Sequence, residues 1–444
     1  MRTPYKHQKK GIQYLKSRAH SALLWEMRTG KSHAIIAAFN HLDRVLVVCP
    51  KPVTSVWHDE LRADGIRRGD MLMVDSGGLD SVRRLPKWVV ANYEAVLRFP
   101  EKWLSKFDVV VLDEAVRIKN PKAKLTKFFI KNFRSARRCI ASGNLAPESP
   151  LEYFSPMQFL YGEWMGCRNF WQFRHRYFWS DPRGWAWWPK SKRTKEQIKD
   201  AVKADAYVLS RKDVGLANEK IFQQRVIEMP PKLRKLYKEM EDEFAMTLPD
   251  GQEIEVKHVI VQLNYLCQLA GGGTTKGWLA DHKIDELVTL LKGELAGEQV
   301  VVWFRFNIEI AHVAERLLKE DIRFGVITGD SEKENRTQIQ AWFKIGLIRV
   351  LLIQVRTGLY GLNLSEASTA IYFSHPLSSN ERLQSEDRIA HPNKRGPLLY
   401  VELVSKDSVD SDLCNALKKK QNQSRYFLGQ VIENMKERRQ HDKT

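Results

Sequence analysis

Short runs of apolar, often β-branched residues alternate with helix-like stretches towards both ends of this chain. In the first half the runs are ALLW (22–25), RVLVVCP (44–50), WVVANY (88–93), FDVVVLDEA (107–115) and RRCIASG (137–143). Continuous Val, Ile and Leu runs without an alternating polar face are typical of strands that are covered on both sides. Strands of this kind with helices between them predict a parallel sheet wrapped by helices, and therefore an α/β fold.

The same alternation returns in the second half of the chain. Its strand-like runs are EQVVVWF (298–304), FGVITGD (324–330), RVLLIQV (349–355), TAIYFSHP (369–376) and LLYVELV (398–404). A chain of 444 residues is too long for a single core and suits two or three domains. We therefore expect two tandem α/β domains, over residues 1–218 and 219–444.

The middle of the chain does not follow this alternation. Residues 151–210 are rich in aromatic and basic side chains, and we expect them to form an insertion in the first domain. Such a stretch predicts either a surface that grips DNA or a satellite core in which the rings bury one another. Residues 231–269 look helical around a polar interruption, TLPDGQEIEV, which suits a hairpin. They predict a helical protrusion on the second domain, and the basic residues after Leu417 predict a C-terminal helix.

The balance of charges favours a polyanionic partner. The chain has 72 Lys and Arg against 53 Asp and Glu, a formal net charge of +19. Nucleic acid is the first candidate for such a partner, and an anionic membrane surface is the second. No run approaches the roughly 18 apolar residues of a spanning helix, and no signal-peptide core follows the start. The five cysteines show no disulfide or zinc spacing, so we expect an intracellular protein that binds nucleic acid and no membrane.

A candidate phosphate-binding loop, EMRTGKS (26–32), lies between the first strand and a helix. Backbone N–H groups and the helix dipole favour an anion at such a helix start. Gly30 would let the chain turn close to a phosphate, Lys31 would neutralise its oxygens, and Ser32 would hold Mg²⁺. The fuller pattern has an earlier glycine, where this chain has Trp25. A chance exposed turn is therefore the alternative interpretation.

A pair of carboxylates, Asp113 and Glu114, ends another buried strand. Ligands of parallel α/β sheets bind at the carboxyl ends of the strands, and we expect this strand to neighbour the one that carries the phosphate loop. Asp113 would orient Mg²⁺ and Glu114 would polarise an attacking water. An acidic turn without function is the alternative.

Together these residues resemble superfamily 2 helicase-like ATPases, specifically the Swi/Snf-like branch of duplex-DNA translocases, in a compact phage or bacterial form. The resemblance runs in order along nearly the whole chain. The matching segments of the first half are PYKHQKKGIQYL (4–15), EMRTGKS, VLVVCPKPVTSVWHDEL (45–61), VVANYEAV (89–96), LDEAVRIKNPKAK (112–124) and SGNLAPESPLEYFSPMQFL (142–160). Those of the second half are KIDELVTLLK (283–292), VVVWFRF (300–306), VLLIQVRTGLYGLNLSEAS (350–368), QSEDRIAH (384–391) and SVDSDLCNALKKKQ (408–421).

The resemblance implies two RecA-like lobes that close on ATP and Mg²⁺ and step along DNA. It implies that catalysis depends on Lys31, Asp113, Glu114 and Arg388, with Mg²⁺ held by Ser32 and Asp113. The implied ATP-binding residues are Gln8, which reads the adenine, and Arg28, Thr29, Gly30, Lys31, Ser32, Gly361, Asn363 and Arg388. The implied contacts to duplex DNA are Lys51, Tyr93, Arg305, Gly329, Thr357 and Gly358.

Three positions depart from the family pattern. Val116 replaces the histidine of DEAH, Asn144 stands in a coupling motif whose proline is displaced to Pro147, and His391 replaces a second arginine. Arg388 and His391 should share one face of a helix, with Arg395 as the alternative second arginine. These departures keep a weakly hydrolysing, ATP-gated clamp open as an alternative. An unwinding helicase for RNA or forked DNA is another, while no PD…ExK-like nuclease cluster is found.

Overall fold

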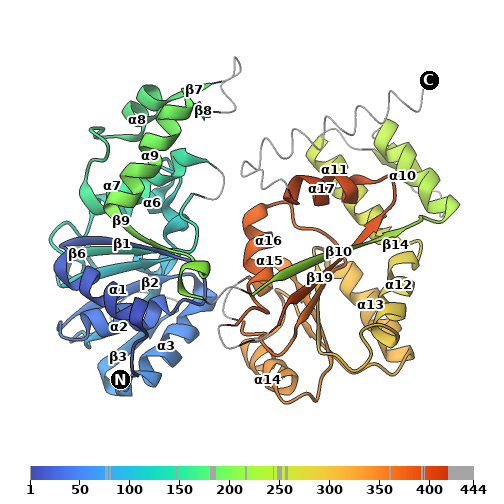
Figure 1. Ribbon diagram of the computed structural model, residues 1–444, viewed down its shortest axis with the longest axis horizontal. Coiled ribbons are helices and arrows are strands. Elements are labelled where there is room, and N and C mark those ends of the chain that lie inside the picture. Colours follow the sequence, from blue (N-terminus) through green and yellow to red (C-terminus); the bar gives the residue numbers. More distant parts are fainter. Residues whose placement is uncertain are drawn as a thin grey trace. The chain divides into compact units, whose positions relative to one another are not determined.

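The computed structural model describes residues 2–75, 79, 82–146, 149–180, 187–215, 218–243, 245–247, 253–255, 259–359, 362–391, 394 and 396–418. The chain divides into two compact units, lobe 1 (Met1–Ala217) and lobe 2 (Asn218–Thr444), each built around its own sheet (Figure 1). The boundary predicted from the sequence lies one residue further along the chain. No helix within the described ranges has the length and apolar content needed to span a bilayer.

Lobe 1 contains a seven-stranded sheet with the order β3-β4-β2-β5-β6-β1-β9, and all of its strand pairs are parallel. The strands are β1 (His20–Trp25), β2 (Val45–Cys49), β3 (Met71–Val74), β4 (Trp88–Asn92), β5 (Val109–Asp113), β6 (Arg137–Ala141) and β9 (Ala206–Leu209). Every residue of β2, β4 and β5 is buried. This is why their sequences read as continuous apolar runs.

Helices cover both faces of the lobe 1 sheet and form a separate apolar core on each. One core contains side chains of α1 (Lys6–Ser17), α2 (Lys31–Phe39) and α3 (Thr54–Ala63). The other contains side chains of α6 (Lys124–Lys131), α7 (Phe154–Tyr161), α8 (Phe170–Tyr177) and α9 (Lys192–Asp205). Two short helices, α4 (Tyr93–Val96) and α5 (Glu101–Leu104), follow β4.

Residues inserted between β6 and β9 form the protrusion of lobe 1. Helices α8 and α9 flank a two-stranded antiparallel hairpin, β7 (Phe178–Ser180) and β8 (Trp187–Pro189), which lies at the far end of this lobe from β3 (Figure 1). The aromatic stretch is partly buried and partly exposed. Phe173 and Phe178 are buried in the lobe 1 core, whereas Trp171 and Trp179 are exposed.

Lobe 2 contains a six-stranded parallel sheet with the order β10-β19-β18-β15-β17-β16. The strands are β10 (Lys220–Ile227), β15 (Val300–Phe304), β16 (Phe324–Ile327), β17 (Val350–Gln354), β18 (Thr369–Tyr372) and β19 (Leu398–Ser405). Its helices are α12 (His282–Lys292), α13 (Asn307–Lys319), α14 (Lys333–Lys344), α15 (Val355–Gly358) and α16 (Ser379–Glu386).

A helical subdomain packs on lobe 2 and has a small core of its own. Its helices are α10 (Pro231–Glu243), α11 (Val259–Gly271) and α17 (Val409–Lys418). Between α10 and α11, β11 (Ala245–Thr247) and β12 (Glu253–Glu255) pair antiparallel, as a hairpin would, and β13 (Gly273–Thr274) pairs with β14 (Gly277–Trp278). The predicted class, two parallel-sheet α/β lobes with helical protrusions, is confirmed. The predicted basic helix beyond residue 418 lies outside the described residues.

Candidate functional site

The phosphate loop of lobe 1 turns at Gly30, which has left-handed backbone angles of φ 78° and ψ 37°. A Cβ atom at this position would lie 2.0 Å from Nε2 of Gln8, so glycine is required for its conformation and for space. The Lys31 ammonium donates hydrogen bonds to the carbonyl oxygens of Trp25, at 2.7 Å, and Glu26, at 3.2 Å. The lysine is therefore folded back over the loop, where it places a positive charge beside the start of α2.

Helix α1 holds this loop from the other side. Gln8 is buried, accepts a hydrogen bond from the Tyr5 backbone N–H at 2.8 Å, and donates through Nε2 to the Gly30 carbonyl at 3.4 Å. His7 Nε2 lies 2.9 Å from the Thr29 carbonyl oxygen. The entry segment and the loop, which the sequence assigned to one ATP site, are thus brought together. Arg28 also has a positive φ of 62°, an unfavourable conformation for a residue with a side chain.

The acidic residues end β5, and the surrounding residues fix their geometry. The Asp113 carboxylate accepts a hydrogen bond from Trp57 Nε1 at 2.8 Å and another from the Glu114 N–H at 3.1 Å. Burial raises the pKa of Asp113, while the hydrogen bond from Trp57 and the positive charge of Lys31 act against that rise. Glu114 is buried and has left-handed angles of φ 52° and ψ 52°. Such strained backbone is concentrated at functional sites.

One expectation about this region is wrong: β1 and β5 are not neighbours, because β6 lies between them. The segment after β6, Ser142–Asn144, therefore lies between the loop and the acidic pair. A Cβ on Gly143 would lie 3.4 Å from Met27 Cγ, so this segment packs against the loop. The Ser142 hydroxyl is fully buried and has no hydrogen-bond partner among the described residues. A buried hydroxyl of this kind suits a polar ligand.

The residues of lobe 1 fit a nucleotide with Mg²⁺. The Gly30 turn leads directly into α2, whose first N–H groups point towards that turn. Asp113 and Ser32 offer oxygen ligands, which Mg²⁺ prefers. A cation beside the buried Asp113 carboxylate would also offset the cost of its burial. Within the described ranges, no group of three or more His, Cys, Asp or Glu residues is arranged to hold a metal.

The predicted nucleotide residues of lobe 2 lie in different environments. Arg388 is buried, and its guanidinium donates to the carbonyl oxygens of Leu362 at 3.2 Å and Gln384 at 3.3 Å. Asn363 is exposed, and Gly361 lies outside the described residues. Arg388 and His391 do not share a helix face, because α16 ends at Glu386. The proline at 392 disfavours helical backbone at the residue before it. Arg395 is also outside the described residues.

The predicted DNA contacts of lobe 1 differ in exposure. Lys51 is exposed at the start of a 3-10 turn after β2. Tyr93 is fully buried, and its hydroxyl donates to the Asp113 carbonyl oxygen at 2.8 Å. This burial removes the Tyr93 side chain from any DNA strand in the described conformation. Its bond instead links the end of β4 to the acidic pair.

Two of the predicted DNA contacts of lobe 2 lie side by side. A Cβ on the exposed Gly329 would lie 3.7 Å from the Thr357 hydroxyl oxygen, so the ends of β16 and β17 meet here. Gly358 has a packing role, because a Cβ there would approach Trp303 to 2.4 Å. Arg305 is half-buried; its guanidinium donates to Cys267 Sγ at 3.1 Å and to the side-chain oxygen of Asn264. Helix α11 therefore holds Arg305.

Sequence reasoning missed two supporting groups. Trp57 orients Asp113, and its only sequence signal is a tryptophan on the helix after β2. Behind α2, His33 Nδ1 lies 2.8 Å from the Asp64 carboxylate, which also accepts hydrogen bonds from Arg2. Although burial raises the Asp64 pKa, the bonds from Arg2 and His33 bring it below its ordinary value. No local pattern links residues so far apart in the sequence.

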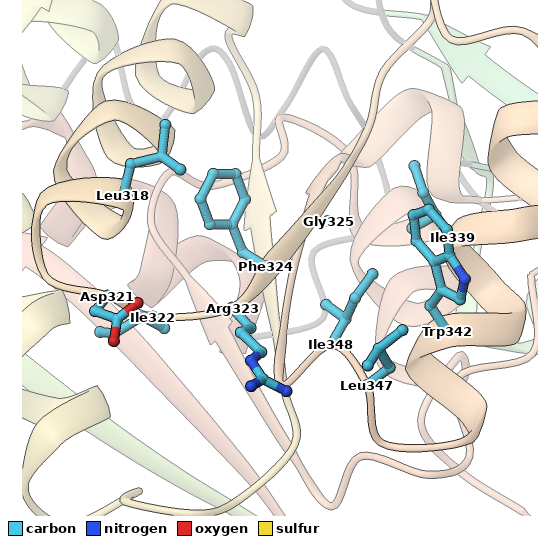
Figure 2. A pocket seen from close by; sticks show the side chains of 10 residues that line it. All are labelled: Leu318, Asp321, Ile322, Arg323, Phe324, Gly325, Ile339, Trp342, Leu347 and Ile348. Atoms are coloured by element: carbon cyan, nitrogen blue, oxygen red, sulfur yellow. The ribbon is translucent and has the colours of Figure 1, made fainter.

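A groove of about 510 Å³ lies at the edge of lobe 2, beside the start of β16. Figure 2 shows its side chains between the end of α13 and α14; they are Leu318, Asp321, Ile322, Arg323, Phe324, Gly325, Ile339, Trp342, Leu347 and Ile348. The lining is mainly apolar. It contains none of the residues predicted to bind ATP or DNA.

Two family models match this chain. The SNF2-related domain matches residues 6–266, and the helicase conserved C-terminal domain matches residues 282–393. Together they include the phosphate loop, the acidic pair and Arg388. The first match alone covers more than half of the chain.

Similar curated proteins include an uncharacterized ATP-dependent helicase of Mycoplasma genitalium, 22% identical over 94% of this chain and 41% of that protein. The SWI/SNF-related matrix-associated actin-dependent regulator of chromatin subfamily A-like protein 1 of Drosophila melanogaster is 22% identical over 76% of this chain and 43% of its own length. This chain thus spans about two fifths of these relatives.

A solved structure, the Sulfolobus solfataricus SWI2/SNF2 ATPase core in complex with dsDNA, has a TM-score of 0.44 and 17% sequence identity, and the match covers 97% of this chain and 93% of that one. The family assignment comes from the sequence matches and from the order of the motifs. The chain belongs to the SNF2-related family, in the Swi/Snf-like branch of the superfamily 2 helicases.

Proposed function

We propose that this protein is a nucleic-acid-stimulated ATPase that uses ATP and Mg²⁺ to move along duplex DNA. The observation that carries the proposal is the phosphate loop at Gly30 and Lys31, which lies within lobe 1 near Asp113, so that the Lys31 charge opposes the rise in the Asp113 pKa. Similar curated proteins include ATP-dependent helicases, and this agrees with the chemistry of those residues.

Each residue of the site has a chemical task in this proposal. The N–H groups at the start of α2 and the Lys31 ammonium bind phosphate oxygens. Glu114, which follows the last residue of β5, accepts a proton from the attacking water. Ser32 and Asp113 hold Mg²⁺, which neutralises charge on the phosphates when it is bound. We further propose that Arg388 of lobe 2 contacts the phosphates during turnover.

Duplex DNA is the proposed track because the motif set resembles translocases of duplex DNA and the net charge is +19. Contacts to phosphates should not depend on base sequence, and they release counterions. The proposed contacts are Lys51, Arg305, Gly329 and Thr357. Tyr93 and Gly358 are better explained as packing residues, since one is fully buried and the other faces Trp303.

An unwinding helicase is the second candidate, and the β11–β12 pair of lobe 2 favours it. These two strands pair from Ala245↔Glu255 to Thr247↔Glu253, in the polar segment whose sequence suits a hairpin, and such a hairpin could separate two strands. A blunt DNA duplex distinguishes the two functions. Separation of its strands would support unwinding, whereas ATP hydrolysis without separation supports translocation.

The direct test is the ATPase rate without nucleic acid, with single-stranded DNA, with duplex DNA and with RNA, at two salt concentrations. The proposal predicts the largest stimulation with duplex DNA. It also predicts an apparent affinity that falls log-linearly with salt, with a slope of about −0.9 per neutralised phosphate. Equal rates in all four conditions would instead support the ATP-gated clamp. Stimulation by RNA alone would contradict the proposed track.

A further inference from the structure

The lobe 1 protrusion exposes tryptophan rings that its own core does not need. Trp171 on α8 is 44% exposed, and Trp179 on β7 is 50% exposed. Phe173 and Phe178, from the same stretch, are buried and anchor the protrusion to the lobe. Large exposed aromatic surfaces mark interaction sites. The buried rings are explained by packing, whereas the exposed rings suggest a binding partner.

The exposed Trp179 and its partner Trp188 form a platform on one face of the hairpin. Trp179 is paired in register with Trp188, and their ring centroids are 4.7 Å apart with planes inclined by 31°. Trp187, the residue before Trp188, contacts α8 through Arg174. The guanidinium carbon of Arg174 is 4.0 Å from the Trp187 ring centroid. The same carbon is 4.5 Å from the Trp171 centroid. Trp187 and Trp188 are consecutive residues of β8, so their side chains point to opposite faces of the hairpin. Arg174 thus packs Trp171 and Trp187 together on the face opposite the Trp179–Trp188 pair.

Basic side chains lie around α8, the helix before the hairpin. The Lys122 ammonium lies 5.2 Å from the Trp171 ring centroid. On α8, His175 follows Trp171 by four residues and shares its side of the helix. A cavity of about 540 Å³ opens beside it, lined by Gly166, Cys167, Arg168, Gln172, His175 and Arg176. Residues 165–199 contain nine Lys and Arg against two Asp and Glu, so the charge favours a polyanion.

We propose that the platform of Trp179 and Trp188, on a protrusion rich in basic residues, binds single-stranded nucleic acid. Unpaired bases stack on these two rings, while the positive charge of the protrusion attracts the phosphates. Every base has a flat aromatic face, so stacking on tryptophan tolerates any sequence. A duplex hides those faces between its own base pairs. The site therefore goes beyond the proposed motor, whose motifs contact the DNA backbone.

The test compares the full chain with its Trp179→Ala/Trp188→Ala variant for binding of fluorescein-labelled oligo(dT). A labelled abasic strand with the same phosphates and a blunt duplex serve as the other two ligands. The variant should bind oligo(dT) roughly 5- to 100-fold more weakly, the range for the loss of a base–aromatic stack. Its affinities for the abasic strand and the duplex should stay within a factor of about two, because phosphate contacts remain.

Matched controls make the result specific. Trp342→Ala removes a partly exposed tryptophan from the groove of lobe 2 and should leave oligo(dT) binding unchanged. Trp179→Ala alone removes the more exposed ring of the pair, and it tests the platform if the double variant does not fold. Unchanged oligo(dT) affinity in the folded variants would overturn the proposal. So would an abasic strand that binds wild type as tightly as oligo(dT), or an equal loss of duplex binding.

The same variants separate this proposal from the motor. The double variant should keep its ATPase activity without nucleic acid and its stimulation by duplex DNA, because none of its substitutions lies in the phosphate loop or the acidic pair. Loss of oligo(dT) binding, with unchanged stimulation of the ATPase by duplex DNA, supports the platform and does not contradict the proposed motor. Failure of stimulation in wild type would count against the motor alone.

Discussion

Gly30→Ala should lower both the stability of lobe 1 and its affinity for ATP, because an alanine at this position has two separate energetic costs. An alanine would have to adopt φ near 78°, which costs about 1–2 kcal/mol for a residue with a Cβ. Its Cβ would also displace the Gln8 side chain, whose Nε2 is 2.0 Å from the ideal Cβ position. Displacement breaks the hydrogen bonds of Gln8 with Tyr5 and Gly30, each worth about 0.5–1.5 kcal/mol.

The expected total is a loss of about 2–5 kcal/mol in the free energy of unfolding. Gly215→Ala is the matched control, since Gly215 has φ 68° and ψ 22° with nothing within 4 Å of an added Cβ. It should cost only the conformational part, about 1–2 kcal/mol. In a Gln8→Ala background, Gly30→Ala should likewise cost only the conformational part, because the Gln8 side chain is no longer displaced. The assay is urea unfolding without nucleotide, followed by titration with a fluorescent ATP analogue.

ATP affinity should fall at least about 10-fold in Gly30→Ala, because the loop must leave its phosphate-binding shape. It should not change in Gly215→Ala, which lies outside the loop. Equal stability losses at the two glycines, together with unchanged ATP affinity in Gly30→Ala, would refute the reasoning. Equal losses would mean that Gln8 does not fill the space beside the loop.

Three further predictions concern chemistry and pH. Glu114→Gln should bind ATP normally and lose at least about 100-fold in turnover, measured by phosphate release, because no base then accepts the proton; normal turnover would exclude this role. Arg388→Ala should lower turnover on the order of 10³-fold, because the guanidinium no longer contacts the phosphates; near-normal turnover in this variant would exclude the role of Arg388. Burial raises the Glu309 pKa to about 7 from 4.5, so stability should fall by about 3 kcal/mol as pH rises between these values. Glu309→Gln should flatten that dependence in thermal unfolding, and an unchanged slope would contradict the assignment.

Much of the fold could be predicted because most strands are buried on both faces. β2 and β5 consist wholly of buried residues and appear in the sequence as uninterrupted apolar runs. β10 was missed for the opposite reason. It is an edge strand with mostly exposed or half-buried residues, KIFQQRVI, and its pairing with β19 is a tertiary interaction that its own sequence does not show.

The candidate site was predictable where the chemistry is local and unpredictable where it depends on packing. Gly30 and Lys31 lie in one short motif, and their places at the start of α2 follow from it. Tyr93 and Trp57 are different, because only the packed lobe shows that both bond to Asp113. The prediction of one helix through Arg388 and His391 is wrong, since α16 ends at Glu386. The proline at position 392 is a local sequence signal against helical backbone at His391.

Displacement of the third strand from a DNA triplex tests the central claim, ATP-driven movement along duplex DNA, most directly. Wild type should displace the strand only with ATP and Mg²⁺, while Glu114→Gln should bind the duplex and displace nothing. A blunt duplex without the third strand should stay annealed. Displacement without ATP would contradict translocation. So would a failure to displace the third strand by a protein whose ATPase activity is stimulated by duplex DNA.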